Sequence, residues 1–353
     1  MRRSVVVGVA VGAIVTGCGG RSGLIGSTID GGAIDAAAIG ADVAANAGSD
    51  ADADVEFDAA GYGEPDASAS GLRAVWSSSQ SDVWAVGALG VIAHFDGQSW
   101  TSFTSGTTEN LTGVSGTGPS DVWATGDNGS VLHWDGAAWS LSDSQDGIAL
   151  LAVWATSPND VWTVGVDWSG GNLGGGSGFV MHWDGSQWQF SDVDDSVSLW
   201  AVWASGPNDV WMVGDDTQGN GVIVRGAGTS ANPFDQASFT GPELRAIWGS
   251  GSQDVWLSPH QGVLQHWDGT SWTPAPSLPS GGEFFSVAGT GPTDVWAVGA
   301  NGAAFHYDGS TWSSSSTGTT ALLSSVWADA PGDAWAVGAG GTIVRWNGTG
   351  WLP

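Results

Sequence analysis

Short runs of apolar residues, separated by Gly, Ser and Asp, follow one another along most of the chain. The first group of such runs is Leu72-Arg-Ala-Val-Trp76, Asp82-Val-Trp-Ala-Val-Gly87 and His94-Phe-Asp-Gly-Gln-Ser-Trp100. Runs of this length, rich in Val and Trp and bounded by turn-forming residues, predict short β-strands.

The same group of runs returns six more times before the C-terminus. The Asp that opens its second run falls at Asp82, Asp121, Asp160, Asp209, Asp254, Asp294 and Asp333, in steps of 39, 39, 49, 45, 40 and 39 residues. Each unit of about 40 residues reads as four strands, here named A to D in chain order. Seven such units predict an all-β fold over residues 71–353, a seven-bladed β-propeller with four antiparallel strands per blade.

Tryptophan marks the register of the repeat. Of the 24 Trp, 22 fall at four repeating positions, one of them in strand B: Trp84, Trp123, Trp162, Trp211, Trp256, Trp296 and Trp335. We expect these 22 to be wedges between neighbouring blades, where each buries a large apolar area. The third position of strand A is always small: Ala74, Gly113, Ala152, Ala201, Ala246, Ser286 and Ser325. Such uniformly small residues predict crowding near a central axis.

Five of the six histidines also share one position, at the end of strand C. They are His94, His133, His182, His266 and His306, and Arg225 and Arg345 take this position in the other two units. A group that recurs in every blade predicts a structural role, in which it holds its own turn, rather than metal binding or acid–base catalysis. His260 lies outside this register.

The N-terminus resembles an export signal. Arg2-Arg3 precedes an apolar run, Val5 to Val15, that is too short to span a bilayer. It ends in Val15-Thr16-Gly17-Cys18, which resembles the lipobox of bacterial lipoproteins. The resemblance implies cleavage after residues 1–17 and acylation of Cys18. The next residue is Gly19 and not the Asp that retains many lipoproteins at the inner membrane, which favours the outer membrane or cell surface. The alternative is an ordinary cleaved signal with an unrelated cysteine.

Residues 18–70 are mostly Gly, Ala, Asp and Ser, as in Asp50-Ala-Asp-Ala-Asp54. This composition cannot bury enough apolar surface to offset chain entropy, so we expect a disordered acidic tether between the lipid anchor and the propeller. The whole chain has seven Arg, 36 acidic residues and a formal net charge of −29. Such a charge argues against nucleic acid as a partner and favours cationic partners or divalent ions.

The turns after strand C carry a family resemblance. The Asp-Gly-x-x-Trp turns at Asp96, Asp135, Asp184, Asp268 and Asp308, with Asn347 as a variant, resemble the Asp-box turns of sialidase-type (BNR) propellers. The pattern Val298-Gly299-Ala-Asn-Gly302 is similar to that of photosystem II assembly-factor propellers and bacterial surface lipoproteins. These resemblances imply the fold and not the chemistry. Sialidases use three Arg, a Tyr nucleophile with a Glu, and an Asp acid. This set does not carry over, because the repeats contain only four Arg, two of them in the histidine register, and their one Tyr, Tyr307, lies in the aromatic register of strand C. We therefore expect no enzyme activity.

Variation among the repeats points to one face of the ring. The A–B turns keep their length, whereas the B–C loop is short at Gly126-Asp-Asn-Gly129 and runs from Gly165 to Gly178 in the third unit. Binding residues are often carried by variable loops on a rigid scaffold. We therefore place the binding surface on the face with the B–C loops and D–A connections, called the loop face below. The opposite face, with the A–B and C–D turns, is the turn face.

The candidate ligand-binding residues lie on the loop face near the third and fourth units. The two Trp outside the register, Trp168 and Trp200, are accompanied by five acids: Asp192, Asp194, Asp195, Asp215 and Asp216. Aromatic faces beside carboxylates suit a sugar, and carboxylates within reach of one another suit calcium, and we expect no other cofactor. The second position of strand A, which holds Arg73, Arg245 and Phe285 besides Trp200, predicts a channel mouth. The alternative is an acidic, solvated loop surface without a ligand.

Three functions remain open from the sequence. The first is a monomeric, surface-tethered propeller that binds a glycan or protein partner through the loop face. The second is a glycoside hydrolase that uses paired carboxylates among the five acids, which requires one of them to have a raised pKa. The third is a structural scaffold for envelope assembly or adhesion.

Overall fold

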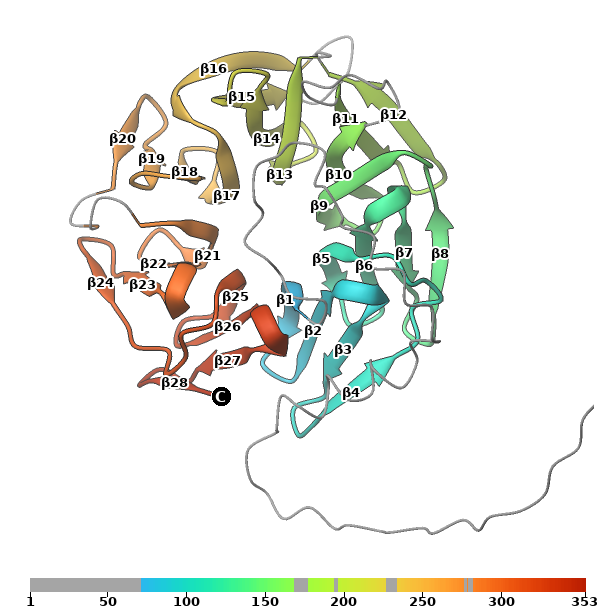
Figure 1. Ribbon diagram of the computed structural model, residues 1–353, viewed down its shortest axis with the longest axis horizontal. Helices are drawn as coiled ribbons and strands as arrows, with labels where there is room; N and C mark the ends of the chain where they lie inside the picture. The colour runs from blue at the N-terminus through green and yellow to red at the C-terminus, as the bar shows by residue number, and fades with distance from the viewer. Residues whose placement is uncertain (1–70, 168–176, 194–195, 227–233, 276–277, 279–281) are drawn as a thin grey trace, which may run out of the picture. The chain divides into compact units, whose positions relative to one another are not determined.

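A computed structural model describes residues 71–353 except 168–176, 194–195, 227–233, 276–277 and 279–281, and the predictions for the signal, Cys18 and the tether lie outside this part. The described residues form seven four-stranded antiparallel sheets arranged as blades around a central channel (Figure 1). The predicted seven-bladed propeller is confirmed. Within the described part, no helix is long and apolar enough to cross a membrane.

Each blade consists of four consecutive strands, with strand A nearest the channel and strand D outermost (Figure 1). The A strands are β1 (Leu72–Ser79), β5 (Leu111–Gly118), β9 (Ile148–Ser157), β13 (Val197–Gly206), β17 (Leu244–Gly251), β21 (Phe284–Gly291) and β25 (Leu323–Ala330). The B strands are β2 (Asp82–Gly87), β6 (Asp121–Gly126), β10 (Asp160–Asp167), β14 (Asp209–Asp216), β18 (Asp254–Pro259), β22 (Asp294–Gly299) and β26 (Asp333–Gly338).

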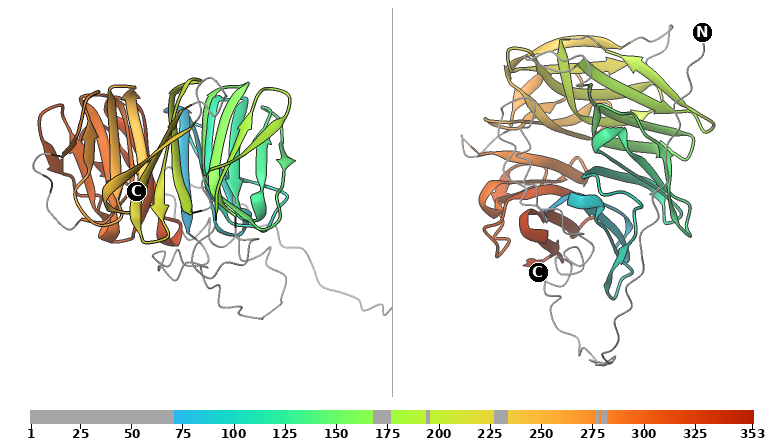
Figure 2. Two further views of the ribbon diagram at one scale, coloured as in Figure 1. Left: turned by 90° about the horizontal axis from the view of Figure 1, so that it is seen from above. Right: turned by 45° about the vertical axis from the view of Figure 1, so that its right-hand side comes forward.

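The two outer strands of each blade are shorter in most units. The C strands are β3 (Ile92–Phe95), β7 (Val131–Trp134), β11 (Ser177–Trp183), β15 (Asn220–Gly226), β19 (Gln265–Trp267), β23 (Ala304–Tyr307) and β27 (Ile343–Trp346). The D strands are β4 (Trp100–Phe103), β8 (Trp139–Asp143), β12 (Trp188–Asp192), β16 (Asp235–Pro242), β20 (Trp272–Pro274), β24 (Trp312–Ser314) and β28 (Trp351–Leu352). Strands of all blades run between the two faces of the ring, as the side view in Figure 2 shows.

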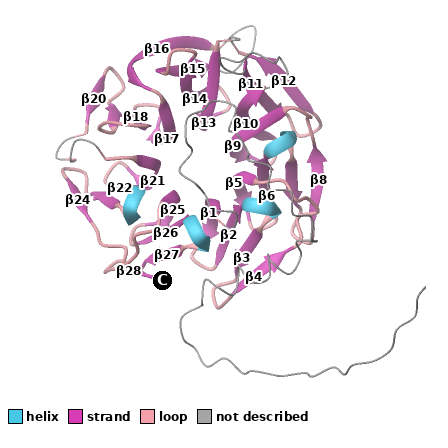
Figure 3. Cartoon of the chain, viewed as in Figure 1, coloured by secondary structure: helices cyan, strands magenta, loops and turns pink. Residues whose placement is uncertain are grey.

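The loop face differs from blade to blade. In blades 1, 2, 6 and 7 a 3-10 turn joins strands B and C: η1 (Ala88–Gly90), η2 (Asp127–Gly129), η3 (Ala300–Gly302) and η4 (Ala339–Gly341) (Figure 3). In blades 3 and 4 the B strands instead continue to Asp167 and Asp216 as longer hairpins. The rigid, repeated part of the molecule therefore presents an irregular set of loops on this face.

Tryptophans of strand B pack between neighbouring blades, as predicted. Trp84 of blade 1 is 1% exposed, and its ring centroid lies 5.1 Å from that of Trp134 in blade 2. Trp335 of blade 7 lies 5.2 Å from Phe95 of blade 1, so the same packing closes the ring. Buried aromatic pairs of this kind add to the apolar area that stabilises the fold.

The histidines of strand C bind the first residue of strand B. In all five blades that carry His, the Nε2 atom lies 2.5 to 2.8 Å from Oδ1 of that Asp, and Arg225 and Arg345 make the same contact at 2.6 Å. Each His ring also stacks on the strand B Trp, with centroids 3.9 to 4.3 Å apart. The contact is structural, but its partner is strand B rather than the turn that follows strand C, because strands B and C run side by side. The Asp of the following turn binds that turn's own backbone, as Asp96 does.

The surroundings of these paired carboxyls also shift their pKa. Burial by itself raises the pKa of Asp82, but hydrogen bonds with His94 and Ser78 outweigh it and hold that pKa below its ordinary value. The seven Asp thus form a ring of anchored carboxylates near the turn face.

Candidate functional site

The candidate residues on strand A lie at a β-bulge. In every blade the pairing of strands A and B skips the second residue of strand A, for example between Leu199 and Ala201. A bulge leaves one residue unpaired and re-aims its side chain. Arg73, Trp200, Arg245 and Phe285 all take this position.

Trp200, Asp215 and Arg245 are in direct contact across blades 4 and 5. The Trp200 Nε1–H donates to Asp215 Oδ1 at 2.5 Å. The Arg245 Cζ atom lies 4.0 Å from the Trp200 ring centroid, so the guanidinium covers one face of the indole. This contact is a cation–π interaction.

Two residues that the sequence analysis did not select complete the cluster. Arg245 Nε and Nη2 donate to Glu243 Oε1 at 3.0 and 2.8 Å. The His260 Nδ1 atom lies 3.2 Å from the same oxygen but makes no hydrogen bond. Glu243 directly precedes β17, and the sequence signal for His260 was its place outside the histidine register. We call Trp200, Asp215, Glu243, Arg245 and His260 the mouth cluster.

The charged groups of the mouth cluster are buried. Asp215 is 7% exposed and Glu243 is 6% exposed, and the Arg245 side chain is 8% exposed. Burial raises the pKa of Asp215, and the nearby Glu243 carboxylate adds to this effect, while the Trp200 hydrogen bond and the Arg245 charge act against it. Arg245 thus pairs with Glu243, and its charge only partly offsets the effect of burial on the Asp215 carboxyl.

Asp216 is adjacent to Asp215 in β14 and has a different role. Successive side chains of a strand point to opposite faces. The Asp216 carboxylate accepts hydrogen bonds from the backbone N–H groups of Gln218 and Asn220 and from the Asn220 side chain. These bonds hold the pKa of Asp216 below its ordinary value against the effect of burial. Asp216 orders its own hairpin rather than joining the cluster.

The other candidates are not brought to this cluster by any contact in the described part of the chain. Trp168, Asp194 and Asp195 lie outside the described residues, and Asp192 is placed by its backbone pairing with Phe179 at the end of β12. Arg73 lies in blade 1, and Phe285 lies in blade 6 beside the cluster's blades. Of the predicted site residues, the structure brings together Trp200, Asp215 and Arg245.

Some of the residues predicted to bind calcium lie outside the described part of the chain. Among the described residues, no group of three or more His, Cys, Asp or Glu side chains is placed to hold a metal ion. The two described carboxyls, Asp215 and Asp216, bind different partners. A calcium site stays a prediction that depends on Asp192, Asp194 and Asp195.

Comparison with known proteins gives the fold and leaves the chemistry open. No family model matches the sequence, and no curated protein matches it. A YCF48 structure from Cyanidioschyzon merolae aligns with a TM-score of 0.60 and 18% identity, covering 78% of this chain and 95% of the other.

Two further solved structures align in the same way. YCF48 bound to a D1 peptide has a TM-score of 0.59 and 18% identity, covering 78% of this chain and 93% of its own. A catalytically inactive virginiamycin B lyase from Staphylococcus aureus, with quinupristin, has a TM-score of 0.62 and 13% identity, covering 78% of this chain and 94% of its own. At such identities the likeness establishes the propeller fold, which is compatible with binding and scaffold roles.

Proposed function

We propose that this chain is a binding propeller that holds a protein partner at the loop-face mouth of its channel, with the mouth cluster as the anchor. The observation that carries the proposal is the burial of Asp215, Glu243 and Arg245 in blades 4 and 5. Removing such charges from water costs several kcal/mol per ion, so a buried ionic cluster is weak evidence for a stabilising role.

The other blades support a functional interpretation of this cluster. At the position of Trp200 and Arg245, blade 1 carries Arg73, and the other four blades carry Leu151, Phe285, Thr112 and Ser324, the last two with hydroxyls that donate to neighbouring backbone carbonyls. In four of the five other blades, an uncharged residue therefore satisfies the fold at this place. Blades 4 and 5 depart from this pattern together, with Arg245 packed on Trp200, and such a departure marks a candidate functional site.

A protein partner fits this geometry better than a glycan. The Trp200 N–H is bound to Asp215, and Arg245 covers one indole face, so one face at most is left for stacking on a sugar. The carboxyls outnumber the guanidinium, which favours a partner segment rich in hydrogen-bond donors or positive charge. A propeller of the same fold that carries a bound peptide, YCF48, lends support by analogy.

The location of the protein belongs to the same proposal. Acylation of Cys18 anchors the chain to the outer membrane or cell surface, and residues 18–70 tether the propeller above it. At roughly 5–6 Å × √n for a flexible chain, a tether of this length spans some tens of Å. Radiolabelled palmitate incorporation that disappears in Cys18→Ala is the expected result, and labelling that persists contradicts the anchor.

Site-specific photocrosslinking on intact cells tests the binding surface. Gln218 on the loop face and Gln98 on the turn face are both exposed, so they are matched sites for a photoreactive residue. We expect one discrete protein adduct from position 218 and none from position 98. The adduct should disappear in Arg245→Gln and in Trp200→Leu while the thermal transition of each variant is retained.

The alternatives predict different results. An adduct from position 98 alone, or one indifferent to both cluster variants, contradicts the proposed surface. Binding on a glycan array that Trp200→Leu abolishes indicates the lectin function instead.

The raised pKa of Asp215 beside Glu243 is the one observation that favours a carboxylate hydrolase. Release of reducing sugar from a panel of polysaccharides, lost in Asp215→Asn, would establish that activity.

A further inference from the structure

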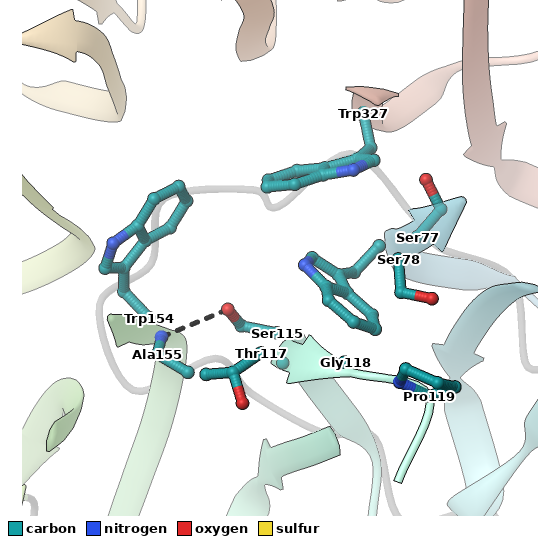
Figure 4. A pocket seen from close by; sticks show the side chains of 11 residues that line it. Ser77, Ser78, Ser115, Thr117, Gly118, Pro119, Trp154, Ala155 and Trp327 are labelled. Carbon is teal, nitrogen blue, oxygen red and sulfur yellow. Dashed lines mark hydrogen bonds between the residues drawn. The ribbon is translucent and has the colours of Figure 1, made fainter. Parts of the chain in front are cut away.

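The turn-face end of the channel holds a cavity of about 430 Å3. It is lined mainly by the aromatic residues Trp76, Trp154 and Trp327 and the hydroxyl residues Ser78, Ser115 and Thr117. Figure 4 shows Trp154 and Trp327 at two sides of the cavity, with Ser115 between the strands below them. Because the mouth cluster lies at the start of strand A and these residues lie near its end, the two sites are at opposite ends of the channel.

The tryptophans of this cavity belong to a repeating position, the fifth of strand A. Five blades carry Trp there, at Trp76, Trp154, Trp203, Trp248 and Trp327, and the other two carry Ser115 and Ala288. Three of the five are buried: Trp76, Trp203 and Trp248 are 4%, 3% and 6% exposed. They act as the predicted wedges.

A glycine in the next blade explains why these three tryptophans are buried. A Cβ atom at Gly116 would lie 2.8 Å from Trp76 Cη2, and one at Gly249 would lie 2.8 Å from Trp203 Cη2. Trp248 has the same relation to Gly289, at 3.0 Å. The indole therefore packs directly over a glycine at the sixth position of the following strand A, where a side chain would displace it.

Trp154 and Trp327 meet no such glycine. The sixth residue of the blade after each is Ala204 and Ser77, respectively. Both indoles are half-buried and contact each other, with centroids 5.9 Å apart and ring planes at 52°. Blades 3 and 7 are not neighbours in the ring, so this contact crosses the channel (Figure 1). Not all 22 tryptophans in the register are thus simple blade wedges.

The missing tryptophan of blade 2 provides the space between them. Ser115 stands where most blades have Trp, and its hydroxyl oxygen accepts a hydrogen bond from Ala155 N–H at 3.1 Å (Figure 4). The serine at position 115, together with Ser77 and Ala204 where other blades have glycine, therefore creates one aromatic cavity.

The surroundings of the cavity favour positive charge. None of its described lining residues is charged, but Ser78 and Thr117 donate their hydroxyl protons to Asp82 and Asp121, so their oxygens can act only as acceptors. Residues 71–353 contain 26 acidic residues, four Arg and no Lys. The faces of aromatic rings attract cations through their quadrupole.

We propose that this cavity binds an organic cation, an ammonium or guanidinium group, against Trp154 and Trp327. Low-dielectric walls within a negatively charged surface raise the local concentration of such a group. The cation belongs either to a small molecule or to a Lys or Arg side chain of a protein, and the chemistry that recognises it is the same.

Calorimetric titration of the full chain tests the proposal. Choline represents the small molecule, and N-acetyl-lysine amide and N-acetyl-arginine amide represent the side chains. The matched control is 3,3-dimethylbutan-1-ol, which has the shape of choline without its charge. We expect at least one cation to bind about tenfold more tightly than this alcohol, as cation–π attraction at a desolvated site implies.

Two alanine-to-glycine variants locate the binding. Ala204→Gly gives Trp154 a glycine to pack over, so the indole should leave the cavity and cation affinity should fall about tenfold. Ala328→Gly is the same change after blade 6, which carries Ala288 in place of Trp, and it should leave affinity unchanged. Circular dichroism and thermal unfolding confirm that both variants fold.

Each outcome decides the matter. Binding by choline alone or by the amino-acid amides alone supports the proposal and identifies the source of the cation. Equal affinity for the uncharged alcohol, no cation binding at millimolar concentration, or equal effects of the two variants overturns it. Loss of the adduct in Arg245→Gln bears on the loop face, so the two proposals fail independently.

Discussion

Asp329 occupies a position at which the other six blades have Ser or Thr. In those blades the hydroxyl donates to the Asp at the start of strand B, as Ser205 does to Asp209 and Thr290 does to Asp294. In blade 7 the partner of Asp329 is Asp333, and buried oxygens of both carboxyls, Asp329 Oδ1 and Asp333 Oδ2, receive no hydrogen bond. Two acceptors face each other where the repeat needs a donor.

The consequence is a stability that depends on pH. Burial, together with the Asp333 carboxyl, raises the pKa of Asp329 from 3.8 to about 6. Because the pKa is higher in the folded state than in the unfolded chain, the folded state binds this proton more tightly. The stabilisation that the proton provides is complete below pH 3.8 and is lost as the pH rises through about 6. We predict that Asp329→Ser raises the free energy of unfolding at pH 7.5 by about 1–3 kcal/mol.

Urea denaturation at pH 7.5 and pH 4.5 measures this difference, which should shrink at the lower pH. The reciprocal variant Ser250→Asp places the same carboxyl pair in blade 5 and should lower stability at pH 7.5. If Asp329→Ser has the same effect at both pH values, the carboxyls do not share a proton.

Strand A carries most of the features that distinguish one blade from another. Its second residue is bulged towards the loop-face mouth, its fifth residue is a wedge or a cavity wall, and its seventh residue is bulged again and binds strand B. One strand thus contributes to the mouth cluster, the turn-face cavity and the Asp ring. The spacing between these positions keeps the two proposed sites at opposite ends.

Glycines in strand A are therefore not interchangeable, and β17 offers a matched pair. A Cβ at Gly249 would lie 2.8 Å from Trp203 Cη2 and 2.7 Å from the Asp254 carbonyl oxygen, whereas one at Gly251 meets nothing within 4 Å. We predict that Gly249→Ala lowers the free energy of unfolding by about 1–3 kcal/mol through overpacking. Gly251→Ala should be neutral or raise it slightly, because it restricts the unfolded chain. Equal effects in denaturant titrations contradict the packing of Trp203 over Gly249.

The repeat made the elements predictable but not their contacts across blades. Blade number, strand order and the strand B wedges follow from a register that recurs seven times, so each unit confirms the others. The contact of Arg245 with Trp200 joins adjacent units, and that of Trp154 with Trp327 joins units opposite in the ring. Such contacts depend on bulges and on which blade lacks a glycine, which no single unit reveals. The sequence also did not identify Glu243 as a site residue, because it lies in a connection between blades and not at a repeated position.

At the scale of the whole ring, the junction between the last and first blades determines how the propeller closes. All seven blades are built from four consecutive strands, so no strand is exchanged between blade 7 and blade 1. Their junction relies on side chains: Ser324 Oγ donates to Leu72 O at 2.8 Å, and Ser325 Oγ accepts from Val75 N–H at 3.2 Å. An equivalent bond, from Val326 N–H to Ser286 Oγ at 3.1 Å, joins blades 6 and 7.

The equivalence of these two bonds predicts that the closing junction is as strong as an internal one. Ser325→Ala and Ser286→Ala each remove the acceptor for one inter-blade N–H, so each should lower the free energy of unfolding by about 1 kcal/mol. Urea unfolding followed by circular dichroism should give one transition with an unchanged slope for both variants, because the ring unfolds as a unit. If Ser325→Ala alone lowers the slope or splits the transition, the ring opens first between blades 7 and 1. The aromatic contact of Trp335 with Phe95 would then be too weak to replace a shared strand.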